Sequence, residues 1–119
     1  MSIIKVCEIL KTRSLLSPDK GKELYDHISE QLEQHAAVTL DFQHCDYISS
    51  SFLNESIGRQ LIDRRWTAEM LRERIRWHHV PDDDDTDILI AVENAETKLH
   101  LINNRIDPDE FYQRHVPEE

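Results

Sequence analysis

The stretch "VTLDFQHCDYISSSFLNESIGRQL", residues 38–61, decides the fold of this chain. Its opening alternates, with the apolar residues Val38, Leu40 and Phe42 at every second position. Because side chains of a strand point alternately to its two faces, this spacing predicts a half-buried strand over 37–42. The residues that follow the strand are polar and lead into a run of serines.

A helix is expected directly after the serines Ser49–Ser51. Leu53, Ile57 and Leu61 recur at every fourth position, which places them on one helical face. The spacing predicts an amphipathic helix over about 51–65. The stretch therefore reads as a strand, a serine turn and a helix.

A strand and a helix are also expected before this stretch. Residues 3–10 are apolar and rich in β-branched side chains, which predicts a first strand. Ser17 suits a helix N-cap and Pro18 suits the first helical position. We expect an amphipathic helix of about 17 residues from this point to near His35.

A short helical turn and three further elements are expected after the serine-turn helix. Thr67 can cap a short helical turn, and the alternation over 74–80 predicts a third strand. Apolar residues at helical spacing predict a helix over about 84–102, although residues 88–92 alone also fit a strand. A last short helix and a tail are expected over 103–119.

The expected order is β-α-β-α-β-α-α. Helical connections between successive strands imply parallel crossovers. We therefore predict an α/β fold with a small, mostly parallel sheet and helices packed against it. No linker or internal repeat interrupts the sequence, so residues 1–119 are expected to form a single domain.

The composition limits the classes of partner. The formal net charge of −10 disfavours binding to nucleic acid or anionic lipid and favours a basic protein surface. No apolar run is long enough to span a bilayer, and the N-terminus lacks the pattern of a signal peptide. We expect a soluble cytoplasmic protein in which Cys7 and Cys45 are buried and reduced.

The segment 38–61 resembles the core motif of the STAS-like family of small bacterial domains, which in turn resemble the STAS domain of anti-sigma factor antagonists. The residues that carry the resemblance are the strand "VTLDF", the run "ISSSF" and the segment "NESIGRQL". The preceding helix and the strand at 74–80 fall where that family has them. The resemblance covers about residues 5–80.

The resemblance implies a role for the serine turn. In the antagonists a serine of the corresponding turn is phosphorylated by a kinase that is also the anti-sigma factor. Aligned on Ile48, the phosphoacceptor position falls on Ser51 and the position before it on Ser50. Ser49 stands where the antagonists have aspartate and Phe52 where they have glycine, which favours docking over phosphorylation. The resemblance also implies a histidine-kinase-type ATPase, encoded nearby, as a candidate partner.

The residues themselves leave three roles open for the turn. One serine can cap the helix, the turn can dock a partner, or a serine can take phosphate, because a helix N-terminus favours a hydroxyl or an anion. Asp41, inside an apolar strand, is expected to accept hydrogen bonds near the serine turn and to support it. The candidate partner-binding residues are Ser49, Ser50, Ser51, Phe52, Asn54, Glu55 and Arg59.

No catalytic or metal site is expected. The segment "HHVPDDDD" (78–85) carries metal-ligand types, but two adjacent strand histidines should point to opposite faces. Its aspartates are better explained as charges and a cap at a helix start. The histidines and serines show no nucleophile and base arrangement, and no glycine-rich phosphate loop occurs. We therefore expect no cofactor and no enzyme activity.

The function favoured by the sequence is a STAS-like regulatory module that binds a protein partner. Two alternatives stay open. The first alternative is a structural subunit of a multi-protein bacterial complex, such as a defence or toxin-control system. The second is a small enzyme that uses the serines or histidines. The sequence gives no oligomeric state.

Overall fold

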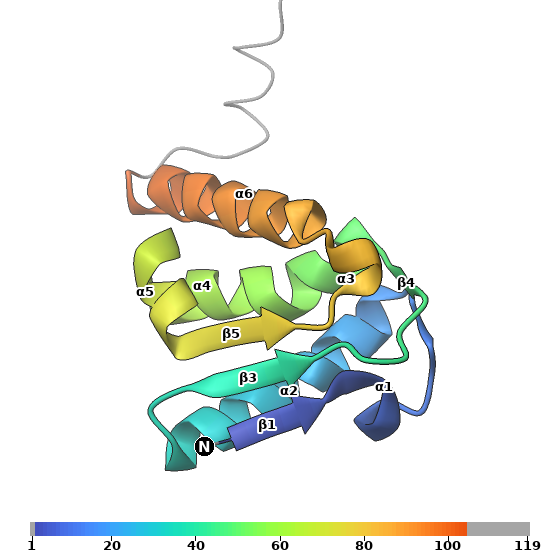
Figure 1. Ribbon diagram of the computed structural model, residues 1–119. Coiled ribbons are helices and arrows are strands. Elements are labelled where there is room, and N and C mark those ends of the chain that lie inside the picture. The colour runs from blue at the N-terminus through green and yellow to red at the C-terminus, as the bar shows by residue number, and fades with distance from the viewer. Residues whose placement is uncertain (1, 105–119) are drawn as a thin grey trace, which may run out of the picture.

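The computed structural model describes residues 2–104 of the chain, which form an α/β fold. Helices and short strands alternate along it (Figure 1). The elements are β1 Ser2–Lys5, α1 Val6–Ile9, β2 Ser14–Leu15, α2 Pro18–Gln34, β3 Val38–Asp41, β4 Tyr47–Ile48, α3 Ser50–Leu53, the π-helical segment η1 Asn54–Gly58, α4 Arg59–Arg64, α5 Ala68–Arg74, β5 Ile75–His78, the 3₁₀ segment η2 Pro81–Asp83 and α6 Thr86–Asn103.

The main sheet has three parallel strands in the order β1-β3-β5. Its register pairs Ile4 with Leu40 and Leu40 with Trp77 on the face that is turned toward the helices. Lys5 pairs with Asp41, and Asp41 with His78, at the carboxyl ends of the strands. The predicted α/β class with a small parallel sheet is therefore confirmed.

The helices cover one face of this sheet. Figure 1 shows α2 and α4 behind the strands, with α6 alongside α4. Helix α2 packs mainly against α3 and η1, and α6 packs against η1 and α4. Within residues 2–104 no helix lies over the opposite face, where the side chain of Ile3 is 52% exposed and Arg76 is exposed.

Helix α2 begins as its sequence predicts. The Ser17 hydroxyl oxygen accepts a hydrogen bond from the backbone N–H of Lys20 at 3.2 Å, and Pro18 is the first helical residue. A Cβ atom added at Gly21 would lie 2.6 Å from the carbonyl oxygen of Phe52. The absent side chain of Gly21 is thus what allows α2 to approach the serine-turn helix so closely.

The serine-turn helix is continuous from Ser50 to Arg64 but contains the π-helical segment η1. The buried hydroxyl of Ser56 donates to the carbonyl of Phe52 at 2.8 Å. Segments of this kind often occur at functional sites, because one extra residue shifts the helical faces. The predicted helix over about 51–65 is confirmed, whereas its internal π turn was not predicted.

The first predicted strand, 3–10, is only half right. β1 ends at Lys5, and the chain turns into the short helix α1. Val6 and Cys7 are buried at consecutive positions, which a strand with one covered face does not allow. Helical spacing instead lets both residues and Leu10 face the core.

The two cysteines form a disulfide, so the prediction of reduced thiols is wrong. Cys7 and Cys45 are joined with a Cα–Cα distance of 5.8 Å, and both residues are buried as expected. The bond ties α1 to the loop after β3. The proximity of the two cysteines could not be predicted from their spacing in the sequence. It depends on the β1–β3 pairing and on the turn into α1.

The C-terminal part of the described chain is helical. α6 covers the predicted helix over 84–102, so the strand alternative for 88–92 is wrong. Ile88, Val92 and Leu99 of this helix are buried. The expected short helix after 103 lies outside the described residues, and within them no helix is both long and apolar enough to cross a membrane.

Candidate functional site

Ser49 is the N-cap of the serine-turn helix. Its hydroxyl oxygen accepts a hydrogen bond from the backbone N–H of Phe52 at 3.1 Å and donates to the carbonyl of Leu16 at 2.9 Å. Its own N–H donates to the carbonyl of Leu15 at 2.8 Å. The capping role proposed for one of the serines is confirmed for Ser49, and the same residue anchors the turn to the segment after β2.

Ser50 and Ser51 are exposed and form no side-chain hydrogen bond within residues 2–104. Both stand in the first turn of a helix that runs on to Arg64. The three serines therefore differ in role. Ser49 holds the turn in place, whereas Ser50 and Ser51 have exposed hydroxyls with no hydrogen bond to residues 2–104.

Two exposed apolar residues belong to the segments that meet at this turn. Tyr47 is 65% exposed and Leu16 is 55% exposed. The small parallel pair of β2 and β4 brings them beside the turn, since Leu15 lies opposite Ile48. We define Leu16, Tyr47, Ser50, Ser51 and Asn54 as the serine-turn surface.

Sequence reasoning missed Leu16 and Tyr47 for this surface. The strands that position them are two residues long, too short for an alternating pattern to be recognised. The available signal was a tyrosine within the polar segment "QHCDYI" that leads into the turn.

The other predicted partner-binding residues differ in their accessibility. The side chain of Phe52 is completely buried, so it belongs to the core and we remove it from the partner surface. Asn54 and Arg59 are exposed and Glu55 is half-buried. The buried Phe52 explains why a bulky residue is tolerated at this point of the turn.

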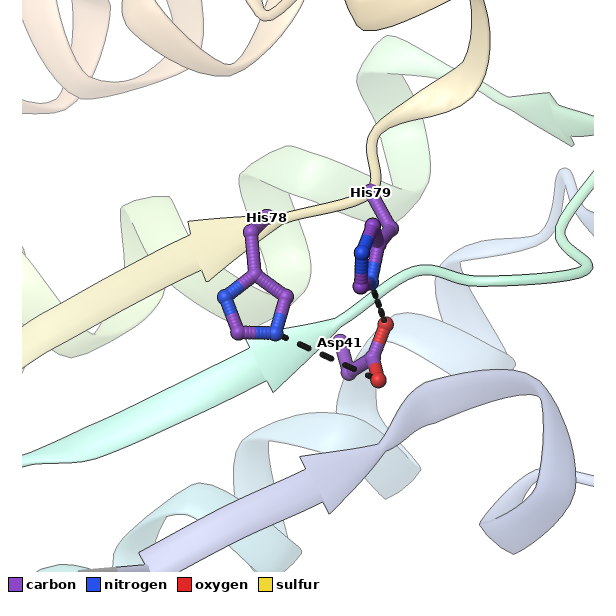
Figure 2. Close-up of side chains that lie close together, drawn as sticks. All are labelled: Asp41, His78 and His79. Atoms are coloured by element: carbon purple, nitrogen blue, oxygen red, sulfur yellow. Dashed lines mark hydrogen bonds and ion pairs between the residues drawn. The ribbon is translucent and has the colours of Figure 1, made fainter.

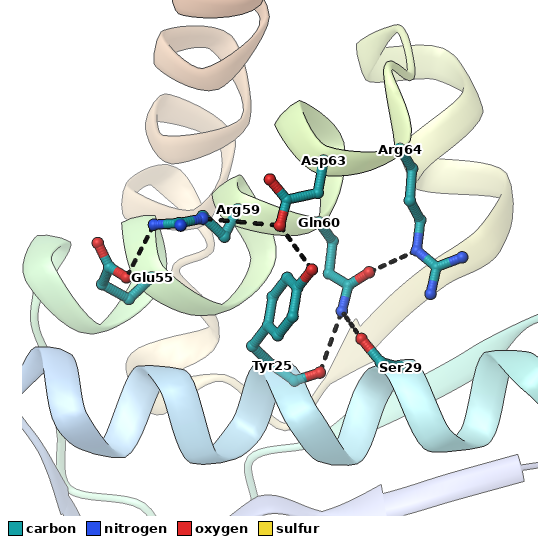
Figure 3. A network of polar contacts seen from close by, with 7 residues as sticks. All are labelled: Tyr25, Ser29, Glu55, Arg59, Gln60, Asp63 and Arg64. Carbon is teal, nitrogen blue, oxygen red and sulfur yellow. Dashed lines mark hydrogen bonds and ion pairs between the residues drawn. The ribbon is translucent and has the colours of Figure 1, made fainter.

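Glu55 and Arg59 belong to a polar seam along α2 and the serine-turn helix (Figure 3). Arg59 contacts Glu55 at 3.5 Å and Asp63 at 3.6 Å, and the Tyr25 hydroxyl donates to Asp63 at 2.6 Å. Exposed ion pairs of this kind contribute about 0–1 kcal/mol. Both ion pairs lie within the serine-turn helix, and of these contacts only the hydrogen bond from Tyr25 to Asp63 joins that helix to α2.

The same seam includes a buried amide. Gln60 donates to the carbonyl of Tyr25 at 3.1 Å and to the Ser29 hydroxyl at 2.8 Å, and its own oxygen accepts from Arg64 at 2.6 Å (Figure 3). Because a buried amide is costly without partners, these bonds fix the orientation of the serine-turn helix on α2.

An acidic groove opens beside the serine-turn surface. Tyr47, Ile48 and Leu53 form part of its wall, and η2 and the start of α6 form the rest. Four carboxylates also line it: Asp46, Asp82, Asp84 and Asp87. A groove with this charge suits a basic side chain or a basic segment of a partner.

The run of aspartates before α6 has two distinct roles. Asp84 accepts hydrogen bonds from the N–H and the hydroxyl of Thr86, and these bonds hold the pKa of Asp84 below its usual value. Asp85 is the N-cap residue by position, but its carboxylate accepts from the Trp77 indole at 3.1 Å instead of capping the helix. The predicted aspartate cap of the helix is therefore not formed by Asp85.

Asp41, His78 and His79 lie together at the carboxyl edge of the sheet (Figure 2). His79 Nδ1 is 2.9 Å from Asp41 Oδ1, and His78 Nε2 is 4.0 Å from Asp41 Oδ2. The prediction that the two histidines point to opposite faces is wrong. β5 ends at His78, and His79 has a φ of 57°, which turns its ring back toward the sheet.

Asp41 does not support the serine turn as predicted. Its carboxylate instead accepts a hydrogen bond from the backbone N–H of Gln43 at 2.9 Å, which orders the loop directly after β3. Burial raises the pKa of Asp41, but the bond from Gln43 and the two nearby histidines lower it more. The net direction is a pKa below the usual value, so the carboxylate stays ionised near neutral pH.

The fold and the serine turn define a class of protein, the STAS-like α/β domains. A family model for a STAS-like domain of unknown function, DUF4325, matches residues 20–85. The chain belongs to this family, which confirms the resemblance drawn from residues 38–61. No curated protein and no solved structure matches the chain.

Proposed function

We propose that this chain is a non-enzymatic STAS-like regulatory module that binds a protein partner through its serine-turn surface. The observation that carries the proposal is that Tyr47 and Leu16, both exposed and apolar, belong to the segments that lead into the turn with the exposed hydroxyls of Ser50 and Ser51. Exposed aromatic side chains with polar neighbours are typical of the energetically important centre of protein interfaces.

The charge of the neighbouring groove indicates the chemistry of the partner. Four aspartates line the groove next to Tyr47, and the chain carries a net charge of −10. We propose that the partner presents a basic segment that enters this acidic groove while an apolar side chain contacts Tyr47. The candidate partner remains a histidine-kinase-type ATPase, which the family resemblance suggests.

Phosphorylation of Ser51 would give this surface a switch. Ser51 is exposed at the position where the antagonists take phosphate. A phosphate there adds a charge of about −2 to the surface that includes apolar Tyr47, and a hydrated dianion is costly to enclose in an apolar contact. We therefore propose that phosphorylation of Ser51 releases the partner, because it is the apolar side chain of the partner, and not its basic segment in the groove, that meets the serine turn.

Site-specific crosslinking in the native host tests the proposal first. A photoreactive residue at Tyr47 or Ser51 should capture one specific protein, whereas the same residue at Met70 should not. Met70 is a matched control because it is an exposed apolar residue, 45% accessible, on α5. Equal capture from all three positions would contradict the assigned surface.

The captured protein, once purified, permits a quantitative test by titration calorimetry. We expect Tyr47→Ala and Ser51→Asp each to weaken binding at least about tenfold, as for residues at an interface centre. Met70→Ala should bind as the wild type does. If Ser51→Ala and Ser51→Asp both bind like the wild type, Ser51 has no regulatory role.

Intact mass spectrometry tests the phosphorylation step separately. Incubation with ATP and the captured ATPase should add one phosphate to the wild type and none to Ser51→Ala. If the wild type gains no phosphate, the switch is wrong, while the docking role is still judged by the binding data.

A further inference from the structure

The carboxyl ends of β3 and β5 bring metal-ligating side chains together. Asp41 is the last residue of β3, His78 is the last residue of β5, and the two are paired in register. In open α/β sheets, ligands bind outside the carboxyl ends of the strands. This edge shares none of its residues with the serine-turn surface.

The three side chains converge on a small volume. Figure 2 shows both imidazole rings turned toward the Asp41 carboxylate. One ligand atom from each residue lies within 4.8 Å of the other two. Ligand atoms bound to one Zn²⁺ at 2.0–2.2 Å lie about 3.4 Å apart, so modest rotations of the two exposed rings would close the site.

The backbone at His79 is held in an unfavourable conformation. Its φ of 57° is in the left-handed region, which is uncommon for residues with a side chain, although histidine adopts it more often than most. Such conformations persist where the surrounding structure holds them, and they gather at functional sites. Without this turn the His79 ring would follow the strand alternation and leave Asp41.

The Asp41 carboxylate is fixed in advance. Its side chain is 10% exposed, and Oδ1 accepts from the Gln43 N–H as well as facing His79. Oδ2 accepts no hydrogen bond from residues 2–104 and faces His78 Nε2 at 4.0 Å. A backbone bond that orients a ligating carboxylate is a usual feature of metal sites.

We propose that Asp41, His78 and His79 bind a divalent transition metal ion, with Zn²⁺ the best-suited ion. Two imidazoles and one carboxylate match the ligands of Zn²⁺ sites with three protein ligands and an open position. Mg²⁺ and Ca²⁺ prefer oxygen ligands and fit this set poorly. The two histidines are about half exposed, so the open position faces solvent and can take water or a ligand from another molecule.

The charges around the site moderate its affinity. Lys5 is the register neighbour of Asp41 on β1 and brings a positive charge to the same edge. Its ammonium is 3.9 Å from the Glu8 carboxylate, which partly offsets that charge. We therefore expect binding weaker than that of a buried four-ligand structural zinc site.

Titration calorimetry with Zn²⁺ tests the site on the full, tag-free chain with its disulfide intact. We expect one ion per chain in the wild type. His78→Ala and His79→Ala should each weaken binding at least about tenfold, because each removes a direct ligand. His100→Ala is the matched control, since His100 is an exposed histidine on α6 and should leave binding unchanged.

NMR spectra of the histidine rings give an independent readout. Zn²⁺ should shift the ring signals of His78 and His79 and leave those of His100 in place. Asp41→Gln, checked for folding by circular dichroism, should reduce the shifts. The proposal is overturned if Zn²⁺ does not bind, or if His79→Ala binds as the wild type does, or if His100→Ala loses as much affinity as the two site variants.

Discussion

Ser49 caps the serine-turn helix and joins the turn to the carbonyl of Leu16. We expect Ser49→Ala to lower the free energy of unfolding by about 1 kcal/mol, because the Phe52 N–H loses its cap. Urea unfolding monitored by circular dichroism measures the change. Ser50→Ala is the matched control and should lie within about 0.5 kcal/mol of the wild type, since its side chain is exposed. Equal losses in the two variants would contradict the assignment of the cap.

Individual residues also show where the sequence was sufficient. Ser17, Ser49 and Thr67 all cap helices, and each stands directly before a helical apolar pattern. Capping is local, so it can be predicted from neighbouring residues. The convergence of Asp41 with His78 and His79 is not local. It requires the pairing of β3 with β5 and a left-handed backbone at His79, which the "HHVP" segment does not predict.

The contact between α2 and the serine-turn helix depends on Gly21. We expect Gly21→Ala to destabilise the protein by about 1–3 kcal/mol despite the better helix propensity of alanine, because the new Cβ would meet the Phe52 carbonyl oxygen at 2.6 Å. Thermal unfolding followed by circular dichroism measures the loss.

Gly58→Ala provides a comparison on the same serine-turn helix, at its contact with α6 instead of α2. Its added Cβ would have its nearest neighbours at 3.6 Å, an ordinary contact distance. The substitution should therefore be neutral or stabilise the protein by up to about 1 kcal/mol. If Gly21→Ala were as stable as Gly58→Ala, the close approach of α2 to Phe52 would be wrong.

At the level of elements, the long helices and the central strand could be predicted, and the short elements could not. α2, α6 and β3 each show a repeated apolar period of their own. α1, β2 and β4 have four residues or fewer, too few to show a period. The π-helical segment η1 lies inside a helix whose apolar residues have ordinary α-helical spacing, so the spacing does not reveal it. The serine-turn surface was therefore predicted only in part, because Tyr47 and Leu16 are positioned by the short strands β2 and β4.

The disulfide acts on the whole molecule. It closes a loop with a sequence separation of 38 between Cys7 and Cys45. We expect the double variant Cys7→Ser, Cys45→Ser to lose about 2–4 kcal/mol of unfolding free energy, because a cross-link restricts the unfolded chain. Reductant should destabilise the wild type by a similar amount and leave the double variant unchanged. Two reactive thiols in the native, unreduced protein would contradict the bond.

At the scale of the whole fold, residues 2–104 present two candidate surfaces that share no residue. The serine-turn surface and the acidic groove form one, and the Asp41, His78 and His79 cluster at the sheet edge forms the other. Composition and motif together predicted the fold class and pointed to the serines of the first surface, but they missed Tyr47 and Leu16. The disulfide and the histidine cluster arise only when β1, β3 and β5 are placed side by side.

The central claim is that the serine-turn surface binds the partner, and hydrogen–deuterium exchange of the complex with the crosslinked partner tests it most directly. We predict slower amide exchange over 46–54 and 81–88, with exchange over the middle of α2 unchanged. Protection confined to α2 or to the strands of the sheet, with the serine turn exchanging as in the free protein, would contradict the account.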